Sequence, residues 1–230
     1  MEYKLIINCK NYLESTGKEF LKLVYACRDL EIKAKELDVD LILVPSTIDL
    51  KESISNKIQT FSQHIDVKTP GSQTGYVVPG VLKSIGIQGT LISHSEHMLE
   101  VDEIEKTIQI AKENGLYTCV CARDSDVAKT VAKFSPDAIA VEPQELIGGD
   151  ISISTAKPEL IKESLAAVNN GAISQSTIPL LLVGAGVKNA QDVKIAIQLG
   201  AKGILVASGV VKAADPKAAI EDLLSGFSKE

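Results

Sequence analysis

The sequence of 230 residues contains no tryptophan, only 4% aromatic residues and no apolar run long enough to cross a membrane. Apolar runs such as 179–183 are far shorter than the roughly 20 residues that span a bilayer. Residues 1–4 lead directly into a predicted strand, so we expect no signal peptide. These absences predict a cytoplasmic protein that does not contact a membrane.

The sequence also lacks a block of basic residues and a Cys-x-x-Cys pair. Its net charge is -6 and its pI is about 5.2, which gives no reason to expect nucleic-acid binding. We expect the four cysteines to be reduced thiols that pack as small apolar residues. Cys119 and Cys121 lie two apart on one predicted strand and should face the same way.

Alternating strand and helix patterns run through the whole chain. The core must consist of Val, Ile, Leu and Ala, which is typical of buried parallel strands. Eight strand–helix units favour a closed (β/α)8 barrel, formed by residues 1–230 as one domain, over an open sheet. No Gly-x-Gly-x-x-Gly follows the first strand, so a dinucleotide-binding fold has no support. The expected strands are 5–8, 40–44, 60–63, 89–92, 116–120, 138–141, 178–183 and 202–206.

Polar residues follow several of these strands, where a barrel of this kind places its chemistry. Lys10 follows the first strand and is either a fixed charge for an anionic substrate or a solvated lysine. His94 follows strand 89–92 and is either a proton donor or a structural histidine. Glu142 ends an apolar strand, where a raised pKa would suit a general base, although a salt bridge at the rim is equally consistent.

An alternative interpretation of residues 94–97 is a metal site. His94, Glu96 and His97 have suitable donor atoms, but His64 is the only other histidine, and no outside ligand is convincing. We therefore predict no metal.

The stretch after Glu142 has the composition of a lid. Pro143 stiffens its start, Leu146-Ile147 gives it an apolar face, and Gly148-Gly149 can act as a hinge.

Small residues follow the last two strands, at 184–186 and 207–209. They are consistent with two tight turns. They also allow backbone N–H groups to approach an anion closely, and these two loops commonly bind phosphate in such barrels. Because small residues follow both strands, we favour a phosphate site.

In content and order these motifs resemble the triosephosphate isomerase family, particularly its shorter archaeal members, over nearly the whole chain. The stretch 140–148 is the most specific part of the resemblance. The matching motifs are Asn8-Cys9-Lys10, Ser93-His94-Ser95-Glu96, Ala140-Val141-Glu142-Pro143-Gln144-Glu145-Leu146-Ile147-Gly148, Val183-Gly184-Ala185-Gly186-Val187 and Leu205-Val206-Ala207-Ser208-Gly209.

The resemblance implies interconversion of D-glyceraldehyde 3-phosphate and dihydroxyacetone phosphate, in glycolysis and gluconeogenesis, without a cofactor. Glu142 would move a proton between adjacent carbons while neutral His94 polarises the carbonyl; triosephosphate isomerase is itself the standard example of this pairing. Lys10 would be the third catalytic residue. The implied substrate-binding residues are Asn8, Lys10, Ile147, Gly148, Gly186, Ala207 and Ser208.

The resemblance also implies an assembly. The loop 66–80 carries Pro70 and Tyr76 and would pack into a neighbouring subunit, so we expect a homodimer or, as in archaeal relatives, a homotetramer. The chain departs from the family pattern at His97-Met98, where a basic residue is common, and at Gly148-Gly149-Asp150.

Two alternatives remain open: a barrel enzyme acting on another sugar phosphate, and a barrel that binds a phosphorylated ligand without catalysis. A binding protein needs the glycine-rich turns but no base. Other phosphate-binding barrels share the turns but not Lys10, His94 and Glu142 in this order, so these three residues favour the isomerase.

Overall fold

The computed structural model describes residues 1–146 and 152–228. Within them, parallel strands pair in the order β2-β1-β8-β7-β6-β5-β4-β3. A parallel bridge between Leu43 and Thr60 joins β2 to the start of β3, so the sheet curls round on itself. The strands are β1 (Tyr3–Asn8), β2 (Val39–Val44), β3 (Phe61–Ser62), β4 (Gly89–Ile92), β5 (Tyr117–Ala122), β6 (Ala138–Val141), β7 (Leu180–Gly184) and β8 (Gly203–Val206).

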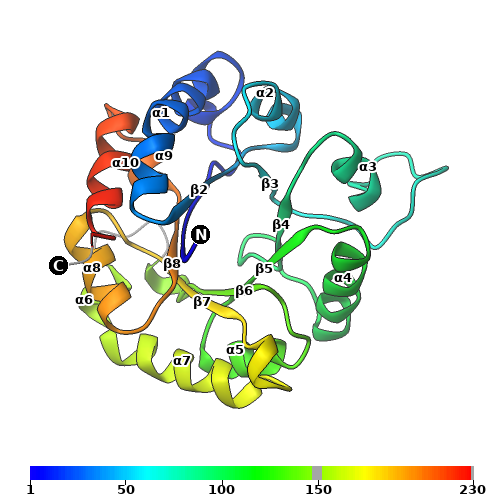
Figure 1. Cartoon of the computed structure of the whole chain (residues 1–230). Coiled ribbons are helices and arrows are strands. Elements are labelled where there is room, and N and C mark those ends of the chain that lie inside the picture. The colour runs from blue at the N-terminus through cyan, green and yellow to red at the C-terminus, as the bar shows by residue number, and fades with distance from the viewer. Residues whose placement is uncertain (147–151, 229–230) are drawn as a thin grey trace.

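Helices surround this sheet, as the view along the barrel shows (Figure 1). The described α-helices are α1 (Gly17–Glu36), α2 (Leu50–Ser55), α3 (Pro79–Ser84), α4 (Val101–Glu113), α5 (Ser125–Ala132), α6 (Ile153–Ala156), α7 (Pro158–Gly171), α8 (Ala190–Gln198), α9 (Ser208–Val211) and α10 (Pro216–Ser225). Short 3-10 helices are η1 (Leu13–Ser15), η2 (Thr47–Asp49), η3 (Gln144–Leu146) and η4 (Gln175–Thr177). The sequence prediction of a (β/α)8 barrel is confirmed.

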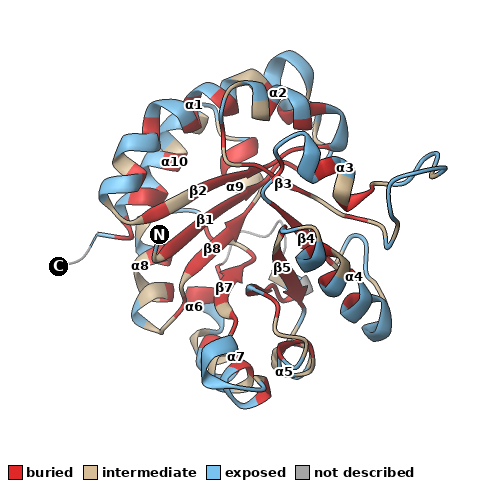
Figure 2. Ribbon diagram, turned by 45° about the vertical axis from the view of Figure 1, so that its right-hand side comes forward, coloured by how far each residue is buried: buried red, intermediate tan, exposed pale blue. Residues whose placement is uncertain are grey.

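The strands have two apolar faces because helices cover the outside and other strands face the inside. On β1, Leu5 and Ile7 belong to the layer between strands and helices, whereas Ile6 belongs to the barrel interior. Cys119 and Cys121 both lie in the interior cluster, as expected from their spacing, and all four cysteines are free and buried. Figure 2 shows buried residues along the strands and exposed residues on the outer sides of the helices.

Some predicted boundaries are wrong. Strand β5 extends to Ala122, beyond the predicted end at 120. Glu100 is the N-cap residue of α4, and Asp102 lies in its first turn, paired with Lys106 at 3.1 Å. Helices α6 and α9 have four residues each, which is too few to show a helical period in the sequence. No helix among residues 1–146 and 152–228 is long and apolar enough to cross a membrane.

Candidate active site

A cavity of about 180 Å³ opens at the carboxyl ends of the strands. The predicted residues that line it lie at or just after the ends of five strands: Asn8, Lys10, His94, Glu142, Gly186, Ala207 and Ser208. The structure therefore brings these predicted residues together. Ile147 and Gly148 lie outside the described residues.

Glu142 is the buried carboxylate of this cavity, with 8% of its surface exposed. It follows β6, and its backbone N–H donates to the Ala122 carbonyl of β5 at 2.9 Å, which continues the sheet pairing. Burial raises the pKa of Glu142 to about 7, although Lys10 and hydrogen bonds from the Cys121 thiol and the Ala185 N–H oppose this rise. The carboxylate is thus ready to accept a proton near neutral pH.

Gly184, at the end of β7, makes room for Glu142. A Cβ atom on Gly184 would lie 2.5 Å from both Cγ and Oε1 of Glu142, closer than any real contact. From the sequence, 184–186 was assigned to an anion of the substrate. Gly184 instead makes room for the carboxylate of Glu142, which belongs to the protein itself.

His94 is 7% exposed and directs its two ring nitrogens at different partners. Nδ1 accepts a hydrogen bond from the Glu96 N–H at 3.2 Å, so in the neutral ring the proton is on Nε2. Nε2 lies 3.5 Å from Oε2 of Glu142. Burial lowers the pKa of His94 and Lys10 lowers it further, against an opposing effect of Glu96. A neutral imidazole with an N–H facing the cavity can polarise a carbonyl oxygen.

Lys10 has an unusual backbone conformation, with a φ of 49°. Its N–H donates to Oδ1 of Asn8 at 3.0 Å, and its carbonyl accepts from Nε2 of Gln63 at 2.8 Å. Its Nζ atom lies 2.6 Å from Oε1 of Glu96. Strained backbone of this kind persists only where its surroundings hold it, and here it directs a lysine side chain into the cavity.

The turns after β7 and β8 form another part of the cavity wall. Ala185 and Gly186 have φ values of 67° and 72°. After β8, Ala207 precedes α9, which begins at Ser208. These residues and Gly209 line the same cavity as Lys10. The arrangement places a positive side chain and small-residue turns around one space, as binding of an anion requires.

Sequence reasoning missed two neighbours of the catalytic candidates. Cys121 lies beside Glu142 and lowers the pKa of its carboxyl group, while burial raises the pKa of the Cys121 thiol, which therefore stays protonated. Its inward direction on β5 was predictable, but its proximity to Glu142 depends on the register of β5 and β6. Glu96 is a candidate metal ligand and part of the matched motif 93–96 in the sequence, and the structure pairs it with Lys10.

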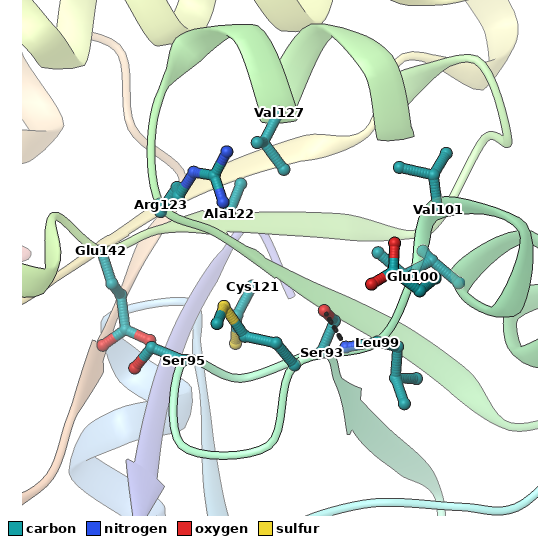
Figure 3. Close-up of a pocket in the computed structure, with 12 residues that line it drawn as sticks. Ser93, Ser95, Leu99, Glu100, Val101, Cys121, Ala122, Arg123, Val127 and Glu142 are labelled. Carbon is teal, nitrogen blue, oxygen red and sulfur yellow. Dashed lines mark hydrogen bonds between the residues drawn. The ribbon is translucent and has the colours of Figure 1, made fainter.

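A second, more apolar cavity of about 280 Å³ adjoins Glu142 between the loops after β4 and β5. Figure 3 shows Glu142 and Ser95 on one side of it and Val101 on the other. Although it is larger, Lys10 and the two glycine-rich turns do not line it. The cavity of about 180 Å³, which Lys10 and both turns line, is therefore the better site for an anionic ligand.

The alternative metal reading gains no support from the geometry. The His97 ring packs against the His64 ring, with centroids 4.3 Å apart. In the part of the chain that the structure describes, no group of three His, Cys, Asp or Glu side chains could hold a metal ion.

Comparison with known proteins decides the family. Residues 4–224 match the family model for triosephosphate isomerase. The chain belongs to the triosephosphate isomerase family. It is 41% identical to triosephosphate isomerases of Methanobrevibacter smithii (96% of this chain and 97% of that protein) and of Cenarchaeum symbiosum (97% of both). A triosephosphate isomerase of Methanopyrus kandleri is 36% identical over 97% of both chains.

The matched residues 4–224 include nearly the whole barrel and all described residues of the cavity. The resemblance in the sequence is confirmed. A barrel for another sugar phosphate and a non-catalytic phosphate-binding barrel are both less favoured.

Proposed function

We propose that this chain interconverts D-glyceraldehyde 3-phosphate and dihydroxyacetone phosphate, with Glu142 as the base, His94 as the electrophile and Lys10 as the charge that holds the substrate. The observation that supports these roles most directly is the convergence of a raised-pKa carboxylate and a neutral imidazole 3.5 Å apart in one cavity. Triosephosphate isomerase family membership supplies the reaction.

The chemistry balances without a cofactor. Glu142 removes a proton from the carbon next to the carbonyl, while the Nε2–H of His94 polarises the carbonyl oxygen and gives an enediol(ate). The proton then returns to the neighbouring carbon, and the hydroxyl proton on that side passes to the former carbonyl oxygen, so an aldose becomes a ketose or the reverse. Lys10 stabilises the negative charge of the bound substrate.

Phosphate binding is assigned to backbone groups around Gly186, Ala207 and Ser208, with Asn8 supporting Lys10 through its 3.0 Å hydrogen bond. Ile147 and Gly148 are proposed as further substrate contacts on the basis of the resemblance alone. A coupled assay with D-glyceraldehyde 3-phosphate tests the reaction. Turnover of this substrate is expected, and its absence in the folded protein would reject the proposal.

The proposal includes a homo-oligomer, either a dimer or a tetramer. The segment between β3 and α3 projects from the barrel (Figure 1). Exposed Ile48, Tyr76, Val81 and Ile85 line one hollow beside it. A second copy of the chain would cover this apolar surface. Sedimentation that showed a fully active monomer would contradict this assembly.

We also propose that residues 1–230 form one domain, because strands from both ends of the chain pair side by side in the barrel. A cytoplasmic location is consistent with an enzyme of glycolysis and with four reduced cysteines.

A further inference from the structure

Two histidine side chains outside the catalytic cavity lie against each other. His64 lies just after β3, and His97 lies in the loop between β4 and α4. The centroids of their rings are 4.3 Å apart, and the ring planes meet at 32°. His64 is partly buried, whereas His97 is exposed. Among the described residues, neither ring lines the cavity that holds His94 and Glu142, so the proposed reaction does not explain this contact.

The His64 ring is joined to the base of the segment that projects between β3 and α3. Its Nε2 atom lies 3.4 Å from Oδ1 of Asp66. The other carboxylate oxygen of Asp66 accepts a hydrogen bond from the Val77 N–H at 2.6 Å, and the Asp66 N–H donates to the Val77 carbonyl at 2.9 Å. Asp66 therefore closes residues 66–77 into a loop, and His64 contacts the carboxylate that closes it.

The His97 ring belongs to the turn that carries His94. The His97 N–H donates to the His94 carbonyl at 2.7 Å, which closes the turn 94–97. Within this turn, the Glu96 N–H donates to Nδ1 of His94 at 3.2 Å. The contact between the two rings thus joins the segment 66–77 to the turn that orients the proposed electrophile.

The charged groups around the two rings favour one proton on the pair and disfavour two. Asp66 faces His64 and can balance a proton on that ring. Glu96 directly precedes His97, but it already pairs with Lys10 at 2.6 Å. A second proton would therefore place like charges on rings 4.3 Å apart. Burial lowers the pKa of His64 and His97 lowers it further, against an opposing effect of Asp66.

We propose that His64 and His97 form a proton-dependent contact between the segment 66–77 and the turn 94–97. The contact is closed while at least one ring is neutral and opens when both rings carry a proton. An ordinary imidazole titrates near pH 6.5, so acidification from neutral pH toward pH 5 charges both rings. The attraction between two neutral rings is weak, and repulsion between like charges at this distance offsets it. This role does not depend on Glu142 or on the isomerase reaction, so it is independent of the proposed function.

The first measurement is an NMR titration of the histidine rings, labelled with ¹³C at Cε1, in the full-length protein. His97→Phe keeps a ring against His64 but cannot take a proton. It should raise the His64 midpoint by about 0.7 pH unit, as removal of a like charge about 4 Å away in largely aqueous surroundings predicts. The rise should shrink in 1 M salt, which screens exposed charges but does not alter burial. An unchanged midpoint would overturn the inference.

The second measurement is amide hydrogen exchange at Val77 and His97, expressed as protection relative to an unfolded peptide at the same pH. In the wild type, protection at both sites should fall about fivefold between pH 7 and pH 5, because linkage makes the second proton weaken the contact as much as the contact weakens that proton's binding. His97→Phe should keep its protection at pH 5. His97→Asn removes the ring and should show the low protection already at pH 7.

Thr118 supplies an internal control. Its N–H donates to the Asp137 carboxylate at 2.8 Å, as the Val77 N–H does to Asp66, but it lies at the amino end of β5, away from the histidine pair. Its protection should not differ between wild type and variants at either pH. Equal loss of protection at Val77 in the wild type and in His97→Phe would overturn the inference. A wild type without isomerase activity would reject the proposed function and leave both measurements unaffected.

Discussion

The Nε2 atom of His94 lies 3.5 Å from the Oε2 atom of Glu142. This distance is too long for a strong hydrogen bond, and Oε2 has no hydrogen-bond partner among the described residues. Burial lowers the pKa of the imidazole and raises the pKa of the carboxyl group. The pair therefore presents a neutral donor and an under-coordinated base to the same space, as proton transfer next to a carbonyl requires.

The pH dependence of catalysis should report the raised pKa of Glu142, about 7. The base works only when ionised, so kcat/KM should rise with pH up to about 7 and level off above it. Because kcat/KM reports the free enzyme, it should be measured from pH 5 to pH 9 at low substrate concentration. An acid limb centred near 4.5, the ordinary value, would contradict the assigned environment.

The same pKa affects stability. Between pH 4.5 and about 7 the folded protein keeps the Glu142 proton that the unfolded chain releases, so the free energy of unfolding falls as pH rises. Glu142→Gln removes this effect and should be more stable than the wild type above pH 7, by up to about 3 kcal/mol. Urea unfolding at pH 4.5 and pH 8 measures the difference. An equal difference at both pH values would contradict the account.

The positions of His94, Glu142 and Lys10 were predictable because each lies within two residues of the end of an apolar strand, and parallel strands bring their carboxyl ends to one rim. The contacts of Gly184 and Cys121 with Glu142 were not predictable. They depend on the register of neighbouring strands, such as Cys121 opposite Ala140, which single-strand patterns do not contain.

Gly184→Ala should impair catalysis without preventing folding. The added methyl group would overlap the Glu142 side chain, which must shift from its position beside His94. We expect kcat to fall about 10²-fold, as misplacement of a reacting group by about 1 Å can cause, with a smaller change in affinity for a phosphate-bearing inhibitor. A variant with wild-type kcat would show that the close approach of Gly184 to Glu142 is not needed.

Gly186→Leu should block the anion site, because Gly186 has a φ of 72° and lines the cavity. Weaker binding of a phosphate-bearing inhibitor is expected, measured by calorimetry. Ser208→Ala is the control, since the proposed donors are backbone N–H groups, and it should be mild. Normal affinity in Gly186→Leu would place the phosphate elsewhere.

The central claim is that Glu142 is the base, and the kcat of Glu142→Gln tests it most directly. Glutamine has nearly the same volume and loses only the ability to take a proton, so the fold and phosphate binding should persist. We expect kcat to fall by at least the 10²–10⁴-fold typical of losing a general base, with little change in KM. A folded Glu142→Gln enzyme that retained more than about a tenth of the wild-type kcat would contradict the account.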